Sequence, residues 1–242
     1  MTRSPHRVQL TTGYLLHHYP WRDSSRILEV FTREHGRLSL FARGVRGPSA
    51  RLAPVLQPFQ LLLLSWSGRG EAPQLTGAER AHHCGALPRG CLLACFYLNE
   101  LLMRLTTRHD PLPQLFDNYQ ATLDALRASA PLAPALRVFE KRLLEVLGYG
   151  LNLATEAHSG ARLASEGWYR FRPALGFVAA ANGSAGAIAG ASLVNLAQET
   201  LRDARELEDA RRVLQAALGV CLEGRPLSSR AVAKSVLRKA AR

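Results

Sequence analysis

Over the first eighty residues, apolar side chains occur in short runs or alternate with polar ones, a pattern typical of β-strands. Clusters of Gly, Pro and Ser separate these runs, and the segments 32–36 and 67–71 have the composition of hairpin connections. Five strands in so short a stretch predict a small closed barrel, for which the OB-fold is the natural candidate. The expected strands are 7–19, 25–32, 37–45, 59–66 and 73–80.

The third expected strand has one apolar and one basic face. Counted in steps of two, Leu38 and Ala42 lie on one side. Phe41 lies on the other side, between Arg37 and Arg43. An aromatic ring on a basic strand face either stacks on a nucleic-acid base or packs beneath a neighbouring segment, and the sequence leaves both readings open.

After residue 80 the apolar period lengthens to between three and four residues, which indicates helices. Periodicity weakens over 151–191, where the segment 168–180 has the pattern of a small hairpin. The predicted class is therefore multi-domain α+β. An OB-fold domain occupies 1–80, and an α-helical domain with a small irregular insertion at 151–191 occupies 81–242. The expected helices are 91–105, 111–128, 134–147, 192–202 and 205–222, with a last one beginning near Ser228.

The formal net charge of +12 is concentrated at the two ends of the chain. Eleven arginines against five acids in residues 1–80, and six cations with no acid in 225–242, leave +6 at each end and none between. A polyanion is the default partner for such basic segments. The alternative is that the charge only aids solubility, because 28 of the 31 basic residues are arginine, which also fits genome composition.

Nucleic-acid single strands are bound by grooves that combine cations along the phosphates with aromatic rings that stack on bases. Trp21, Arg22 and Arg26 precede or begin the second strand, and other arginines follow the third strand or occupy a turn. The candidate DNA-binding residues of the barrel are Arg22, Arg26, Arg37, Phe41, Arg43, Arg46, Arg51 and Arg69. A basic stripe with a spacing of four on the last expected helix adds Arg230, Lys234 and Arg238.

Common catalytic signatures are absent, including the phosphate-binding loop and the motifs HExxH, GxSxG and GxGxxG. We therefore predict no enzyme, no catalytic residue and no cofactor. The segment 82–95 holds two histidines and three cysteines, but Cys91 and Cys95 fit an apolar helix stripe, so no metal site is predicted. No apolar run reaches the length of a membrane span and no signal peptide is recognisable, which favours a cytoplasmic protein.

Several segments together resemble the RecO family of bacterial DNA repair and recombination mediators. They are, in the family's order, HHYPWRDSSRILEVFTREHGRLSLFARGVRG, LQPFQLLLLSWSGRGE, YLNELLMRL, ALRVFEKRLLEVLGYGLNL and GRPLSSR. The resemblance covers most of the chain and implies the same OB-fold and helical domains. It also implies a protein that binds single- and double-stranded DNA and anneals complementary strands. With RecR, and in some pathways RecF, such a protein helps to load RecA onto DNA coated by the single-stranded-DNA-binding protein.

The resemblance further implies a site for the acidic C-terminal tail of the single-stranded-DNA-binding protein. Arg137 matches the basic residue that the family places on its tail-binding surface. Lys141 is its i,i+4 neighbour, and both are expected opposite the buried face of their helix. The resemblance implies no cofactor turnover. Because the family acts on DNA, the resemblance also implies a cytoplasmic protein associated with the nucleoid.

The chain departs from the family pattern at one point. Many members carry a CxxC zinc site just after the LGYG segment, whereas 152–163 contains His158 and no cysteine. No zinc is therefore expected, and the insertion should be held by ordinary packing. Two other readings remain open: an OB-fold protein that binds RNA, and a non-catalytic scaffold that binds acidic protein segments.

Overall fold

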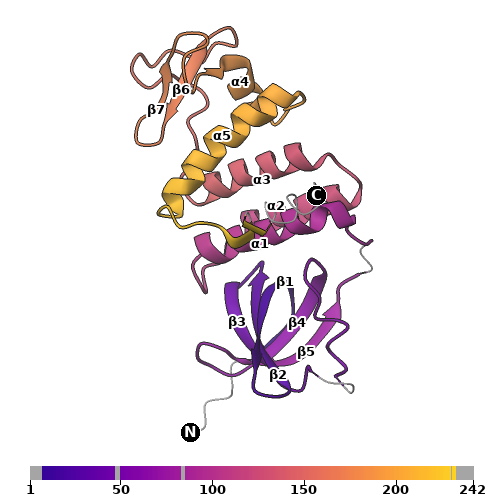
Figure 1. Cartoon of the computed structure of the whole chain (residues 1–242). Helices are drawn as coiled ribbons and strands as arrows, with labels where there is room; N and C mark the ends of the chain where they lie inside the picture. Colours follow the sequence, from indigo (N-terminus) through magenta and orange to yellow (C-terminus); the bar gives the residue numbers. More distant parts are fainter. Residues whose placement is uncertain (1–6, 47–49, 83–84, 230, 233–242) are drawn as a thin grey trace. The chain divides into compact units, whose positions relative to one another are not determined.

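The computed structural model describes residues 7–46, 50–82, 85–229 and 231–232 (Figure 1). By contacts between residues, the chain divides into two compact units. Unit 1 comprises Met1–Leu123 with Leu227–Arg242, and unit 2 comprises Asp124–Pro226. The boundary expected near residue 80 marks the change from strands to helices. The division by contacts lies further along the chain, because α1 and most of α2 are grouped with the barrel.

Unit 1 begins with five strands that close into a barrel in the order β1-β2-β3-β5-β4 (Figure 1). Neighbouring strands are antiparallel except for β3 and β5, which are parallel. This strand order confirms the predicted OB-fold. The strands are β1 (Arg7–Trp21), β2 (Ser25–Thr32), β3 (Gly36–Ala42), β4 (Leu61–Ser67) and β5 (Gln74–Arg80).

The barrel interior is filled by every second side chain of its strands, as the alternation predicted. Leu38, Leu40 and Ala42 of β3 lie in this core, opposite Leu28 and Val30 of β2. The core also contains Leu15, Val45, Leu56, Leu62, Leu64, Trp66 and Leu75. The other face of each strand is therefore left for helices or for ligands.

Two helices of unit 1 cover one part of the outer barrel face. A 3₁₀ turn, η1 (Arg89–Cys91), leads into α1 (Leu92–Leu105), and α2 (Pro113–Arg127) follows, its last four residues belonging to unit 2. Tyr14 and Phe31, which are paired across β1 and β2, both pack against Phe116 of α2. Asn99 of α1 donates its side-chain N–H to the carbonyl of Leu16 at 2.9 Å.

A buried carboxylate joins the barrel to the connector between α1 and α2. Glu29 of β2, whose side chain is 3% exposed, accepts hydrogen bonds from Arg37 (3.2 Å), Arg108 (2.5 Å) and Ser39 (2.7 Å). Arg37 also donates to the hydroxyl and the carbonyl oxygen of Thr106, and its own carbonyl accepts the His109 N–H. The connector therefore lies across the outer face of β2 and β3 at this point.

Gly36 makes this close approach of the connector possible. It has a positive φ of 65°, and an added Cβ would collide with the backbone of Asp110. No other residue type combines that backbone conformation with the required space.

Unit 2 contains three helices and a small sheet. The helices are α3 (Leu132–Val146), α4 (Gly190–Gln198) and α5 (Ala204–Cys221). The sheet has the order β7-β6-β8, from β6 (Trp168–Arg172), β7 (Gly176–Ala179) and β8 (Ile188–Ala189). The antiparallel β6–β7 pair confirms the predicted hairpin, whereas β8 was not predicted. Asp203 and Glu206 form a reciprocal capping box at the start of α5.

Glu29→Gln should lower the free energy of unfolding by about 3 kcal/mol, because it removes the charge that neutralises the largely buried Arg37. Urea unfolding of the whole chain measures this change. Arg108→Ala is the matched control, since the Arg108 side chain is 46% exposed and its loss should cost about 1 kcal/mol or less. Equal losses in the two variants would contradict the role assigned to the buried carboxylate.

Candidate nucleic-acid interface

The outer face of β1, β2 and β3 carries an aromatic row. The register pairs Tyr19 with Ile27 and Ile27 with Phe41. Because the next residues along, Leu28 and Leu40, lie in the barrel core, these three side chains point outward. Tyr19 is 44% exposed, and Phe41 is half-buried. Phe41 is thus on the surface predicted for it, in one cross-strand row with Tyr19 but separated from it by Ile27.

Cations surround this row. Trp21, 46% exposed, pairs with Ser25 in the next row, and Arg43 is exposed immediately after β3. Arg46 donates to the carbonyls of Arg22, through its side chain, and of Ser24, through its backbone N–H, both at 3.0 Å. The segment after β3 is therefore tied to the β1–β2 turn. We call this surface the barrel face; it comprises Tyr19, Trp21, Arg22, Phe41, Arg43 and Arg46. Arg26 borders it: since Arg26 pairs with Ala42 of the barrel core, it lies on the inward side of β2, at the end of the barrel.

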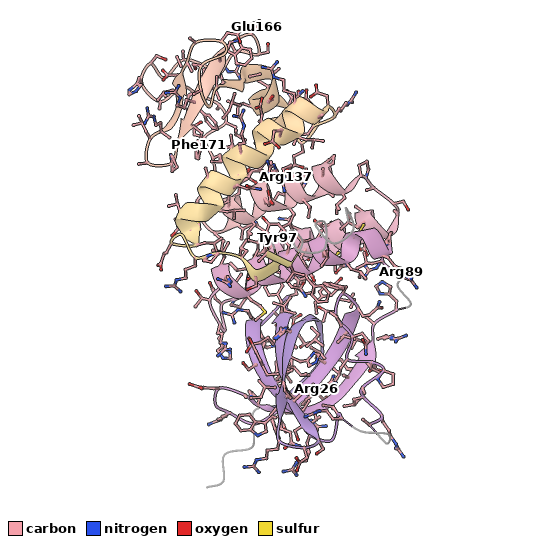
Figure 2. All side chains as sticks on the ribbon, in the orientation of Figure 1. Arg26, Arg89, Tyr97, Arg137, Glu166 and Phe171 are labelled. Atoms are coloured by element: carbon pink, nitrogen blue, oxygen red, sulfur yellow. The ribbon has the colours of Figure 1, made fainter. Side chains whose placement is uncertain are left out.

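The charge of the barrel face comes from guanidinium groups that have no acidic partner. Within the part of the chain that the structure describes, Arg22, Arg26, Arg43 and Arg46 form no ion pair. Burial, and after it the nearby charges of Arg26 and His17, lower the pKa of His18. His18 is therefore neutral at pH 7. Figure 2 shows Arg26 on the barrel, away from α1.

The remaining predicted DNA-binding residues are distributed around this surface. Arg69 is exposed in the β4–β5 turn, which adjoins β3 because the Phe41 N–H donates to the carbonyl of Pro73. Arg51 is exposed in a turn after residues 47–49, which the structure does not describe, and no ion pair joins its side chain to another described residue. Three predicted residues lie outside the described residues: Arg230, Lys234 and Arg238.

Arg37 does not occupy the solvated face on which the sequence pattern placed it. Its side chain is 13% exposed and binds Glu29 and Thr106 beneath the α1–α2 connector. The alternation along β3 was right, but the connector covers this part of the outer face. Arg37 therefore joins the α1–α2 connector to the barrel within unit 1.

The two predicted tail-binding residues are also less exposed than expected. Arg137 is buried on α3 and donates to Glu140 at 2.7 Å, so the prediction that it lies opposite the buried face is wrong. Lys141, 11% exposed, pairs with Glu145 and with Glu199 of the α4–α5 connection. The reason is that α3 is covered on more than one side, including by α5.

The Arg137–Glu140 pair faces α5, and Figure 2 shows Arg137 between α3 and α5. The pKa of Glu208 on α5 is lowered, mainly by its hydrogen bond from Arg211 and in smaller part by the charges of Arg212 and Arg137. The charge of Arg137 therefore stabilises a carboxylate on the neighbouring helix of unit 2, that of Glu208.

Two exposed aromatic residues of the barrel face, Tyr19 and Trp21, were not among the predicted site residues. The expected first strand ended at Tyr19, so Trp21 was read as a residue that precedes the next strand. Pairing the strands backward from the short Arg22–Ser24 turn would have placed Tyr19 in register with Phe41 through Ile27. The signal that could have identified Tyr19 and Trp21 is the register between neighbouring strands. Alternation along a single strand gives no information on that register.

A closed barrel with an aromatic and basic outer face defines an OB-fold protein whose surface has the composition of a nucleic-acid interface. The family model described as "Recombination protein O N terminal" matches residues 7–83, and the one described as "Recombination protein O C terminal" matches residues 91–231. The chain belongs to the RecO family of DNA repair proteins, which confirms the resemblance seen in the sequence.

Similar proteins with the name DNA repair protein RecO align over nearly the whole chain. The protein of Methylococcus capsulatus is 43% identical over 231 residues, which cover 96% of this chain and 95% of the relative. That of Nitrosococcus oceani is 40% identical, with 96% and 95% covered. That of Paraburkholderia xenovorans is 39% identical, with 95% and 77% covered. A DNA repair role follows from this membership.

The loop after the LGYG segment, where the resemblance implied zinc cysteines in many family members, is closed by a carboxylate. Glu156 accepts hydrogen bonds from the Ser159 hydroxyl (2.5 Å), the Ser159 N–H (2.6 Å) and the His158 N–H (3.1 Å). Among the described residues, no group of three or more His, Cys, Asp or Glu side chains could hold a metal ion. The described helices also include none long and apolar enough to cross a bilayer.

These hydrogen bonds lower the pKa of Glu156 to about 2, the Ser159 hydroxyl contributing most. The stabilisation they provide should be fully present above the ordinary value of 4.5 and lost as the pH falls toward 2. Carboxyl NMR titration, with Glu156→Gln to assign the signal, measures this. A midpoint near 4.5 would show that the carboxylate does not close the loop.

Proposed function

We propose that this RecO-family protein binds single- and double-stranded DNA at the barrel face and anneals complementary strands. The observation that carries the proposal is the row of Tyr19, Ile27 and Phe41, bordered by Trp21 and by arginines without acidic partners. In OB-folds, the outer face of strands 2 and 3 and the adjoining turns are the usual oligonucleotide surface. Arg22, Arg26, Arg43 and Arg46 contact phosphates, with Arg69 and Arg51 at the border.

The mechanism is electrostatic and requires no covalent step. Guanidinium groups neutralise phosphates on each strand and release counterions, which lowers the repulsion between two strands that are to be paired. Phosphate contacts carry no base information, so any sequence can be annealed. Tyr19, Trp21 and the exposed part of Phe41 stack on unpaired bases and hold a strand open for pairing. The protein works as a mediator without catalytic residues, cofactor or metal.

The proposal includes the partners that the family resemblance implies. Arg137 and Lys141 contribute to binding the acidic tail of the single-stranded-DNA-binding protein, which brings the mediator to coated DNA. Both cations are engaged by carboxylates of unit 2, so the tail carboxylates compete with Glu140, Glu145 and Glu199 for them. With RecR, and in some pathways RecF, the protein then helps to load RecA, in the cytoplasm on the nucleoid.

Stacking and phosphate contacts make different predictions for binding to single strands. Trp21→Ala should weaken binding about tenfold, at about 1–3 kcal/mol per stacked base, without changing the dependence on salt. Arg43→Ala with Arg46→Ala should reduce the slope of log affinity against log salt by about 1.4, at about 0.7 per phosphate. Fluorescence anisotropy across a salt series measures both.

Duplex DNA provides the control for these variants, because its bases are already stacked. Trp21→Ala should bind duplex like wild type, whereas the double arginine variant should bind it more weakly. Unchanged affinity in both variants would remove the barrel face from the interface. A strong preference for RNA in competition would favour the RNA-binding reading.

The function is tested by annealing complementary strands coated with single-stranded-DNA-binding protein, with and without its acidic tail. Annealing should be faster with the tail, and Arg137→Ala should remove this difference while naked strands anneal normally. Arg142→Ala removes a cation of the same helix and should retain the difference. Absence of annealing with and without the tail would refute the proposed function.

Because Arg137 is buried, the folded fraction of each variant has to be verified by its unfolding curve. Arg137→Met keeps most of the side-chain volume and replaces Arg137→Ala if the latter is unstable. Equal loss of annealing on naked and coated strands in a folded Arg137 variant would contradict a tail-specific role.

A further inference from the structure

The small sheet of unit 2 has a basic face of its own. Tyr169 lies in the core cluster of this unit and Phe171 packs against it, as do residues of β7 and β8. Since side chains alternate along a strand, Trp168, Arg170 and Arg172 lie on the opposite face of β6. Their cross-strand neighbours are uncharged: Ala189, Val178 and Gly176.

A third guanidinium joins this face from α5. Arg205, in the first turn of α5, lies over the Trp168 ring at 4.6 Å from its centroid. Stacking on an aromatic ring orients a guanidinium and leaves the N–H donors in its plane available for a planar or tetrahedral anion. We call Trp168, Arg170, Arg172 and Arg205 the small-sheet face.

The arginines of this face are not used in ion pairs, unlike most cations of unit 2. Among the described residues, the ion pairs of this unit use Arg127, Arg137, Lys141, Arg142, Arg211, Arg212 and Arg225. Arg170, Arg172 and Arg205 occur in none of them, and the Nε of Arg170 is buried without a hydrogen-bond partner.

The acids at the start of α5 are already engaged. Asp203 and Glu206 close the capping box, while Asp209 accepts hydrogen bonds from Ser192 and Arg212. Among the described residues, none of these carboxylates forms an ion pair with Arg170, Arg172 or Arg205. An anion from outside the chain is the ligand that this arrangement fits.

We propose that the small-sheet face is a second DNA-binding surface, which holds the phosphate backbone of a strand independently of the barrel face. Arg170 and Arg172 are about 6.6 Å apart along β6, at about 3.3 Å per residue. This span is about two steps of a B-form strand, which carries one charge per 3.4 Å or so. The inference rests on the proposed function and extends it, because annealing requires one protein to hold two strands.

A nucleic-acid strand fits this face better than an acidic peptide does. Acidic recognition tails that carry apolar residues need an apolar groove beside the cations. An apolar pocket of unit 2, of about 250 Å³, is lined by Phe171, Tyr149, Leu175 and Val220 among others. Phe171 alternates with Arg170 and Arg172, so the pocket lies on the other side of β6 from the small-sheet face.

The test counts binding sites for a short single-stranded oligonucleotide on the whole protein at low salt. The oligonucleotide is chosen at the short end of the span of one OB-fold, about 4–16 nucleotides, so that one surface is enough to bind it. Isothermal titration should give two oligonucleotides per wild-type chain. Arg170→Ala with Arg172→Ala should leave one, and Arg43→Ala with Arg46→Ala should also leave one.

The matched control is Arg211→Ala with Arg225→Ala, which removes the same charge from unit 2 at residues that are ion-paired to Glu208 and Glu223. It should retain both sites, which separates a local contact from a general loss of positive charge. Arg170→Gln with Arg172→Gln replaces the alanine pair if that variant does not fold.

The outcomes distinguish the inference from the proposed function. If the Arg170 and Arg172 variant retains the wild-type number of sites while the barrel variant loses one, the second surface is refuted and the function stands. If only the small-sheet variant loses a site, the barrel face is refuted. If that variant loses binding to an acidic tail peptide and keeps both DNA sites, the face binds protein and the inference fails.

Discussion

The architecture of unit 1 depends on the buried Glu29 carboxylate. Its three hydrogen bonds, from Arg37, Arg108 and Ser39, bind the α1–α2 connector to the outer face of β2 and β3. That face is thereby divided: the row containing Glu29 and Ser39 is covered, and the next rows, with Phe41 and Tyr19, remain open. A barrel face can bind a ligand only where helices and connectors leave it uncovered, so this ion cluster sets the border of the interface.

The arginines of this protein fall into two physical groups. Those paired with buried or half-buried carboxylates, such as Arg37 and Arg137, carry charge that is cancelled within the protein and serve packing. Those without acidic partners, such as Arg43 and Arg170, retain their charge for an external anion. The net charge of +12 alone therefore does not say which surface binds an anion, because it does not separate paired arginines from those without an acidic partner. Binding to DNA depends on where charge is left uncompensated.

Much of the fold was predictable because its signals are local. The five barrel strands follow from alternation and turn composition, and the observed strands differ from the expected ones by a few residues at their ends. The hairpin of β6 and β7 was predictable for the same reason. Strand β8 was not, because Ile188 and Ala189 form too short a segment to show a period and are held by pairing with Trp168 and Tyr169.

By itself, the sequence determined the OB-fold, the family, and the two faces of β3, since each depends on periodicity or on the order of segments along the chain. The tertiary structure decided which of the outward arginines face solvent. Arg37 is bound by Thr106, 69 residues away, and no local pattern reports a contact over that separation. It also decided that Tyr19 and Phe41 share one row on either side of Ile27, because register joins residues of different strands. The tertiary structure likewise placed the guanidinium of Arg205 over the Trp168 ring.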